Sequence, residues 1–101
     1  MAEVLAHELV VVGGGVAGCT AALYAERYNL DVVLLEKGAP GGMTATASKV
    51  DNYPGFPEGI SGYDLTQSMR RQATKFGLEA VTAEVVGIEL SSGGQKVVKT
   101  L

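Results

Sequence analysis

The chain has 101 residues, enough for one domain at most. Its 47% hydrophobic content indicates a folded globular chain, and its net charge of −3, without a basic cluster, excludes nucleic-acid binding through phosphate neutralisation. No apolar run approaches the roughly 20 residues of a membrane helix, and the N-terminus lacks a signal-peptide pattern, so we expect a cytoplasmic protein without membrane contact. A single cysteine excludes an internal disulfide, a Cys-x-x-Cys pair and a thiolate metal cage, so no metal site is predicted.

The first predicted elements are a strand, a glycine-rich turn and a helix. Leu9–Val12 is typical of a buried parallel strand, and an alanine-rich helix is expected over Ala17–Tyr28. Between them, Gly13 permits a sharp turn, Gly15 lets a pyrophosphate approach the backbone, and Gly18 lets the helix pack closely. The free N–H groups at the helix start favour phosphate. The pattern predicts a dinucleotide site, the alternative being a plain tight turn in another α/β domain.

Glu36 follows the second predicted strand, Asp31–Leu35, and lies 18 residues beyond Gly18 (36 − 18). A carboxylate there accepts hydrogen bonds from ribose hydroxyls and repels a 2′-phosphate, which favours FAD or NAD over NADP. The alternative is a solvated acid at a strand end. Lys37 is either a solvated charge or a contact to the adenosine. The two strands and the helix predict a parallel βαβ unit.

The cysteine and the histidine have simpler interpretations. Cys19 stands at a helix N-terminus, where the dipole favours a thiolate, but a small packed side chain is the preferred interpretation. His7 has no further metal ligand beside it in the sequence, and we expect it to be solvated.

The middle of the chain is predicted to be irregular up to a second helix. Residues 38–42 contain three glycines and a proline, and a short helix or turn is expected in Met43–Lys49. The proline-stiffened loop Asp51–Gly59 is long enough to suggest a functional role. Ser61 caps the second helix, which Gly77 ends. Its apolar face, predicted to be core, consists of Leu65, Met69, Ala73 and Phe76.

The last part of the chain is predicted to be β-structure. Glu79–Leu90 forms a strand, or two strands with a kink near Glu84. The turn Ser91–Gly94 joins it to Gln95–Leu101 in an antiparallel hairpin. Exposed apolar strand edges are expected, and with them association of the isolated chain.

Two further motifs indicate a family. Gly41-Gly42-Met43-Thr44 and Asn52-Tyr53-Pro54-Gly55-Phe56-Pro57 follow the glycine loop and Glu36 in this order. With them the chain, from about Glu8 to its end, resembles the N-terminal FAD-binding segment of bacterial thioredoxin reductases, which are pyridine nucleotide-disulfide oxidoreductases. The resemblance implies a three-layer α/β, Rossmann-like FAD/NAD(P)-binding fold, with a parallel sheet and an antiparallel hairpin. Residues 1–101 would form a single, incomplete FAD-binding domain.

The resemblance also implies cofactor-binding residues and no catalytic residue. Backbone N–H groups would hold the FAD pyrophosphate at Gly13, Gly15, Val16, Ala17 and Gly18. Glu36 would bind the adenosine ribose beside Lys37, and the backbone near Val85 would meet the adenine. The flavin side would be formed by Gly41, Gly42, Met43 and Asn52. Two positions depart from the family, which commonly has Gln at Met43 and Pro at Val16, so no amide hydrogen bond to flavin is available from Met43.

In the family, the enzyme is a homodimer in which NAD(P)H reduces FAD. The flavin then reduces a disulfide of a thioredoxin-like partner. The nicotinamide domain with its Cys-x-x-Cys pair is absent from residues 1–101. We therefore expect a fragment, a truncation or half of a split protein, which binds FAD at most and needs its remainder or a complementing chain for activity. The alternatives are a ferredoxin–NADP reductase of the same architecture and a non-catalytic nucleotide-binding module.

Overall fold

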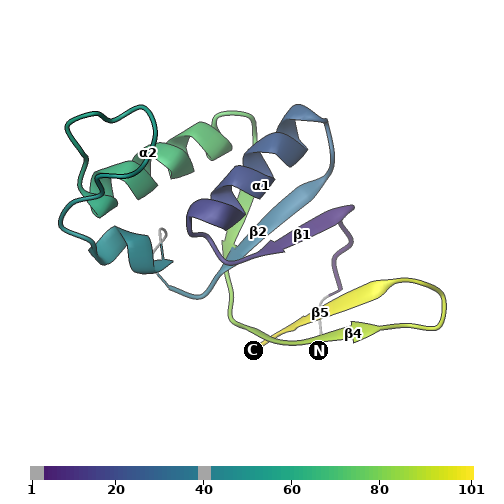
Figure 1. Ribbon diagram of the computed structural model, residues 1–101. Coiled ribbons are helices and arrows are strands. Elements are labelled where there is room, and N and C mark those ends of the chain that lie inside the picture. Colours follow the sequence, from purple (N-terminus) through teal and green to yellow (C-terminus); the bar gives the residue numbers. More distant parts are fainter. Residues whose placement is uncertain (1–3, 39–41) are drawn as a thin grey trace.

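Three parallel strands form the centre of the fold. The structure, a computed structural model, describes residues 4–38 and 42–101. Strands β1 (Leu9–Val12), β2 (Val32–Glu36) and β3 (Glu79–Thr82) lie in the order β1-β2-β3, and both neighbouring pairs are parallel. Figure 1 shows helix α1 (Val16–Arg27) crossing from β1 to β2, so the predicted βαβ unit is confirmed.

The remaining elements build outward from this sheet. Helix α2 (Gly62–Thr74) packs beside α1, and a short 3-10 helix, η1 (Gly42–Thr46), packs against α2. In Figure 1, α1 and α2 lie above the sheet, η1 lies to its left and the hairpin lies below it. This arrangement confirms the expected parallel sheet with an added hairpin. Gly41 lies outside the described residues.

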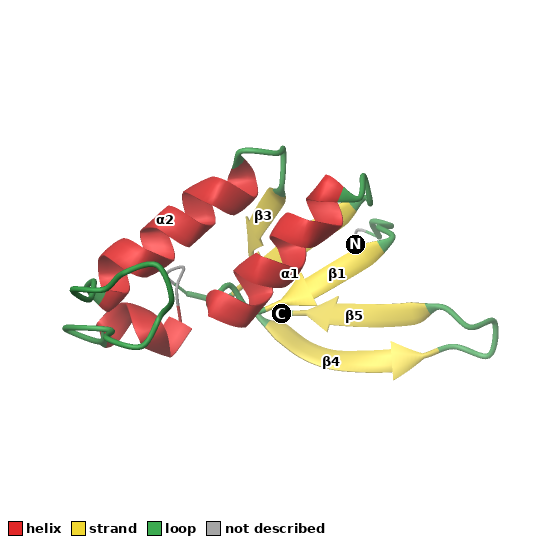
Figure 2. Ribbon diagram, turned by 45° about the horizontal axis from the view of Figure 1, so that its top comes forward, coloured by secondary structure: helices red, strands yellow, loops and turns green. Residues whose placement is uncertain are grey.

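The hairpin is separate from the parallel sheet. Strands β4 (Val85–Leu90) and β5 (Lys96–Thr100) pair in antiparallel fashion, as Figure 2 shows, and the predicted break near Glu84 separates β3 from β4. Val86, Ile88 and Leu90 alternate along β4 and are exposed. The expected exposed apolar strand positions are therefore present.

Burial is concentrated in the central strand and in the helix faces above it. Val32, Val33 and Leu34 of β2 are buried. The prediction of a fully buried β1 is wrong, since Val11 is its one buried residue and Val12 is 49% exposed. In the sheet that residues 4–38 and 42–101 form, β1 lies at the edge and pairs with β2 alone.

Helix α2 begins as predicted, but it ends before the predicted terminator Gly77, with Lys75 as its C-cap. The Ser61 hydroxyl accepts the Asp64 N–H at 3.0 Å, and Gly77 has a φ of +94° just beyond the helix. Leu65 and Ala73 are buried, but the core assignment of Phe76 is wrong. The helix ends at Thr74, and the ring of Phe76 is 40% exposed with Arg27 and Lys75 over it.

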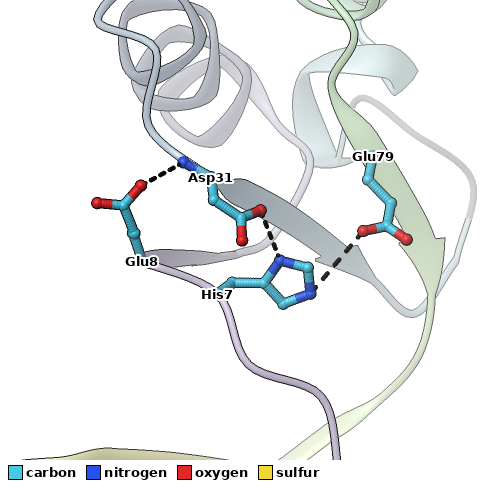
Figure 3. A network of polar contacts seen from close by, with 4 residues as sticks. All are labelled: His7, Glu8, Asp31 and Glu79. Carbon is cyan, nitrogen blue, oxygen red and sulfur yellow. Dashed lines mark hydrogen bonds and ion pairs between the residues drawn. The ribbon is translucent and has the colours of Figure 1, made fainter.

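The expectation of a solvated His7 is also wrong. Its side chain is only 14% exposed, and Nδ1 lies 3.0 Å from Asp31 Oδ1 while Nε2 lies 3.8 Å from Glu79 Oε2 (Figure 3). The Glu8 carboxylate accepts the Asp31 N–H at 2.9 Å. These residues lie at the beginnings of all three parallel strands, so the sheet topology brings together acids that are distant in the sequence.

Among residues 4–38 and 42–101, neither α-helix is long and apolar enough to cross a lipid bilayer.

Candidate functional site

The glycine-rich turn after β1 is shaped by one close backbone approach. Gly13 has a φ of +100°, and its N–H donates to the Leu35 carbonyl at 2.8 Å. A methyl group on Gly18 would overlap the Gly13 carbonyl oxygen. Helix α1 can therefore begin this close to the end of β1 only with glycine at position 18, as the motif predicts.

The start of α1 leaves backbone donors available to a ligand. Its N-cap residue is Gly15, which has no side chain to accept a hydrogen bond, and the first turn contains no acidic residue. Val16 and Ala17 are the first residues of the helix, so their N–H groups have no intrahelical acceptor. This arrangement suits an anion such as a pyrophosphate.

Glu36 is held by the same turn. Its Oε1 accepts the Gly14 N–H at 2.7 Å, and its Oε2 accepts the Gly38 N–H at 3.1 Å. An ionised carboxylate offers about four acceptor sites, so two remain for the hydroxyls of a ribose. The sequence reasoning missed Gly14, the middle residue of Gly13-x-Gly15, whose backbone orients the acid. A methyl group on Gly14 would lie 3.2 Å from Glu36 Oε1. This crowding distinguishes glycine at position 14, but it is visible only in the folded structure and not in a sequence pattern.

The Gly14 N–H, followed by the weaker contribution of Gly38, holds the pKa of Glu36 below its ordinary value of 4.5, although partial burial opposes the shift. The folded state therefore favours the ionised carboxylate. The stabilisation is complete above the unfolded-state pKa and is lost as the pH falls through the lower folded-state pKa.

We expect the stability difference between wild type and Glu36→Gln to be constant above a pH of about 5 and to shrink in more acidic solution. Urea unfolding of both proteins between about pH 7 and about pH 3 measures it. Parallel pH profiles for the two proteins would contradict a folded-state carboxylate stabilised by Gly14.

The residues predicted to contact the adenosine line one cleft, called here the adenosine-side cleft. It has a volume of about 200 Å³ and lies where β1 and β2 end and β4 begins. Glu36, Lys37 and Val85 all line it, together with Gly13. Positions that are far apart in the sequence and were predicted to contact one nucleoside are therefore neighbours.

The structure brings the residues predicted to contact the flavin together only in part. A methyl group on Gly42 would lie 3.6 Å from Gly15 Cα, so the start of η1 rests against the glycine turn. Met43 is 87% exposed, and Asn52 is exposed as well. Neither side chain lines the adenosine-side cleft.

Cys19 has the properties of a packed residue. It is 3% exposed, and its Sγ lies 3.4 Å from the Gly14 carbonyl oxygen, to which it donates. Burial raises the pKa of the Cys19 thiol, and the charge of Arg70 only partly opposes this effect. The thiol is therefore neutral, which supports the packing interpretation over a reactive thiolate. Among residues 4–38 and 42–101, no group of three or more His, Cys, Asp and Glu side chains could hold a metal ion.

A larger cavity of about 270 Å³ lies between α1, α2 and the loop at residues 51–59. Tyr53 and Phe56 of that loop line it with their rings 6.2 Å apart, opposite Tyr24 and Met69 of the helices. It shares no lining residue with the adenosine-side cleft, which contains Glu36 with its hydrogen-bonded carboxylate. Of the two, the smaller cleft therefore has the acid that suits a ribose.

Known proteins are similar to this chain in sequence and in fold. Residues 8–51 match the family model described as FAD dependent oxidoreductase. NADPH-dependent thioredoxin reductase 3 of Arabidopsis thaliana is 42% identical in an alignment of 90 positions that covers 85% of this chain and 17% of that protein. The bifunctional thioredoxin reductase/thioredoxin of Mycobacterium leprae (strain TN) is 46% identical over 84 residues, which are 83% of this chain and 18% of that protein.

A comparison with solved structures also finds a thioredoxin reductase. Thioredoxin reductase of Lactococcus lactis superposes with a TM-score of 0.87 at 36% identity, over 94% of this chain and 31% of that chain. The chain thus spans less than a third of the length of each of these proteins.

Proposed function

Because this chain matches the N-terminal, FAD-binding part of thioredoxin reductases, we propose that residues 1–101 form a single FAD-binding domain that holds the ADP half of the cofactor. The observation that carries the proposal is the position of Glu36, whose carboxylate accepts the Gly14 N–H at 2.7 Å and lines the same cleft as Val85. An ionised acid at this position binds both ribose hydroxyls and repels a 2′-phosphate.

The chain's own groups fit each part of the ADP moiety. Backbone N–H groups at the start of α1 would bind the pyrophosphate, and Gly18 keeps that helix close to β1. Glu36 would orient the ribose, with Lys37 and Val85 lining the adenosine side. Bound flavin would supply the two-electron chemistry, to which the neutral, buried Cys19 contributes no redox group.

For the whole protein we propose the activity of an NAD(P)H-dependent thioredoxin-disulfide reductase, with a thioredoxin-like disulfide protein as substrate. The names of the two sequence relatives support this assignment, and their alignments cover 83–85% of this chain. The nicotinamide site and the redox disulfide lie outside residues 1–101. We also propose that the protein works in the cytoplasm as a homodimer.

Titration of the purified protein with FAD tests the proposal. We expect a yellow complex, and we expect ADP to displace the flavin because both ligands use Glu36 and the start of α1. ADP that carries an additional 2′-phosphate should compete poorly, since Glu36 repels it. A protein that remains colourless after unfolding and refolding with excess FAD would rule out the proposal and favour a non-flavin nucleotide module.

A further inference from the structure

Gly62, the first residue of α2, lies directly against η1. It is buried, and its N–H donates to the Ala47 carbonyl at 2.9 Å. A methyl group at this position would overlap the Thr44 carbonyl oxygen and would lie 2.9 Å from the Ala47 carbonyl oxygen. The absence of a side chain at Gly62 therefore sets how closely η1 approaches α2.

If a side chain were added here, η1 would move and α2 would stay in place. Helix α2 is anchored by the buried residues Leu65, Thr66 and Ala73, whereas η1 contains no buried residue. Alanine is also a better helix former than glycine, so the substitution does not weaken α2 itself. The steric conflict is with backbone atoms, so rotation of a neighbouring side chain cannot relieve it.

Movement of η1 reaches the glycine turn through Gly42. This residue begins η1, and a methyl group on it would lie at van der Waals distance, 3.6 Å, from Gly15 Cα. Glu36, by contrast, is held by Gly14 and Gly38, so its position does not depend on η1.

We propose that Gly62 is a positioning residue for the flavin half of the cofactor. By letting η1 lie against α2, it keeps Gly42 against Gly15 at the start of α1, so that η1 would border the flavin half of a bound FAD. This inference rests on the proposed FAD site. ADP lacks the flavin half, so it serves as the ligand that does not use η1.

Binding of FAD and of ADP to Gly62→Ala tests the proposal. We expect the affinity for FAD to fall about tenfold or more, while the affinity for ADP stays within about twofold of wild type. The fluorescence of the bound flavin should change as well. Gly93→Ala is the matched control, because the same methyl group there meets open space. A purely structural role would lower both affinities together, so the ratio of the two is the diagnostic quantity.

A folded Gly62→Ala protein that binds both ligands like wild type, or that loses both equally, would overturn the proposal. If Gly62→Ala does not fold, Thr46→Val replaces it. The Thr46 hydroxyl donates to the Met43 carbonyl at 2.7 Å within η1 and is exposed, so its loss loosens η1 without touching α2. Wild-type affinity of Thr46→Val for FAD would overturn the proposal. Wild-type protein that binds ADP but not FAD would refute the proposed function itself.

Discussion

Gly18→Ala should destabilise the fold by about 2–3 kcal/mol, the upper part of the range for an overpacked core. The added methyl group would overlap the Gly13 carbonyl oxygen and approach the side chain of Val11. Two backbone segments would have to separate, and no side chain can rotate to relieve the contact. Since small domains are stable by only about 5–15 kcal/mol, this is a large fraction of the total. Urea unfolding followed by circular dichroism measures the effect.

Gly93→Ala again provides the control for Gly18→Ala. Its methyl group meets open space and its backbone has no positive φ, so its unfolding midpoint should match that of wild type. We also expect Gly18→Ala to lose FAD binding even where it remains folded, because separation of α1 from β1 displaces the N–H groups that hold the pyrophosphate. An unchanged midpoint for Gly18→Ala would show that the helix can begin farther from β1 than the structure has it.

Glu36→Gln should weaken the binding of both FAD and ADP by about 10- to 100-fold. This loss corresponds to about 1.4–2.8 kcal/mol in total, the net contribution of roughly one charge-assisted hydrogen bond to the ribose. The single amide oxygen of Gln could accept the N–H of only one of Gly14 and Gly38, and its NH2 group would face the other N–H donor. Discrimination against a 2′-phosphate should diminish, since the repelling charge is gone.

Isothermal titration with FAD, ADP and 2′-phosphorylated ADP measures this change. Glu58→Gln makes the same chemical change in the exposed loop and controls for net charge. If Glu36→Gln binds each of the three ligands with the same affinity as wild type, the acid at position 36 does not contact the ribose.

The sequence predicted those features in which local chemistry and long-range structure agree. The strand, glycine turn, helix and acid were recognisable because each residue has a physical role within one βαβ unit. The meeting of Lys37 and Val85 in one cleft followed from family resemblance and not from periodicity. Gly14 was missed because it acts through a backbone N–H, which every residue type except proline supplies; only its crowding against Glu36 distinguishes it.

The errors came from neighbours that are distant in the sequence. His7 is surrounded by Asp31 and Glu79 only after three strands have aligned. Strand β1 has the composition of a central strand but lies at the edge. Phe76 fits the helical spacing of α2, yet the helix ends before reaching it.

The polar network at His7 also bears on the order of events in folding. The pair with Glu79 joins residues 72 positions apart (79 − 7), and closing a chain segment of that length is opposed by conformational entropy until other contacts hold the ends together. Strand β3 must therefore dock before the imidazole gains its second carboxylate. Contacts completed after the rate-limiting step slow unfolding and leave the folding rate unchanged. We therefore expect removal of the His7–Glu79 pair to speed unfolding and to leave the folding rate unchanged.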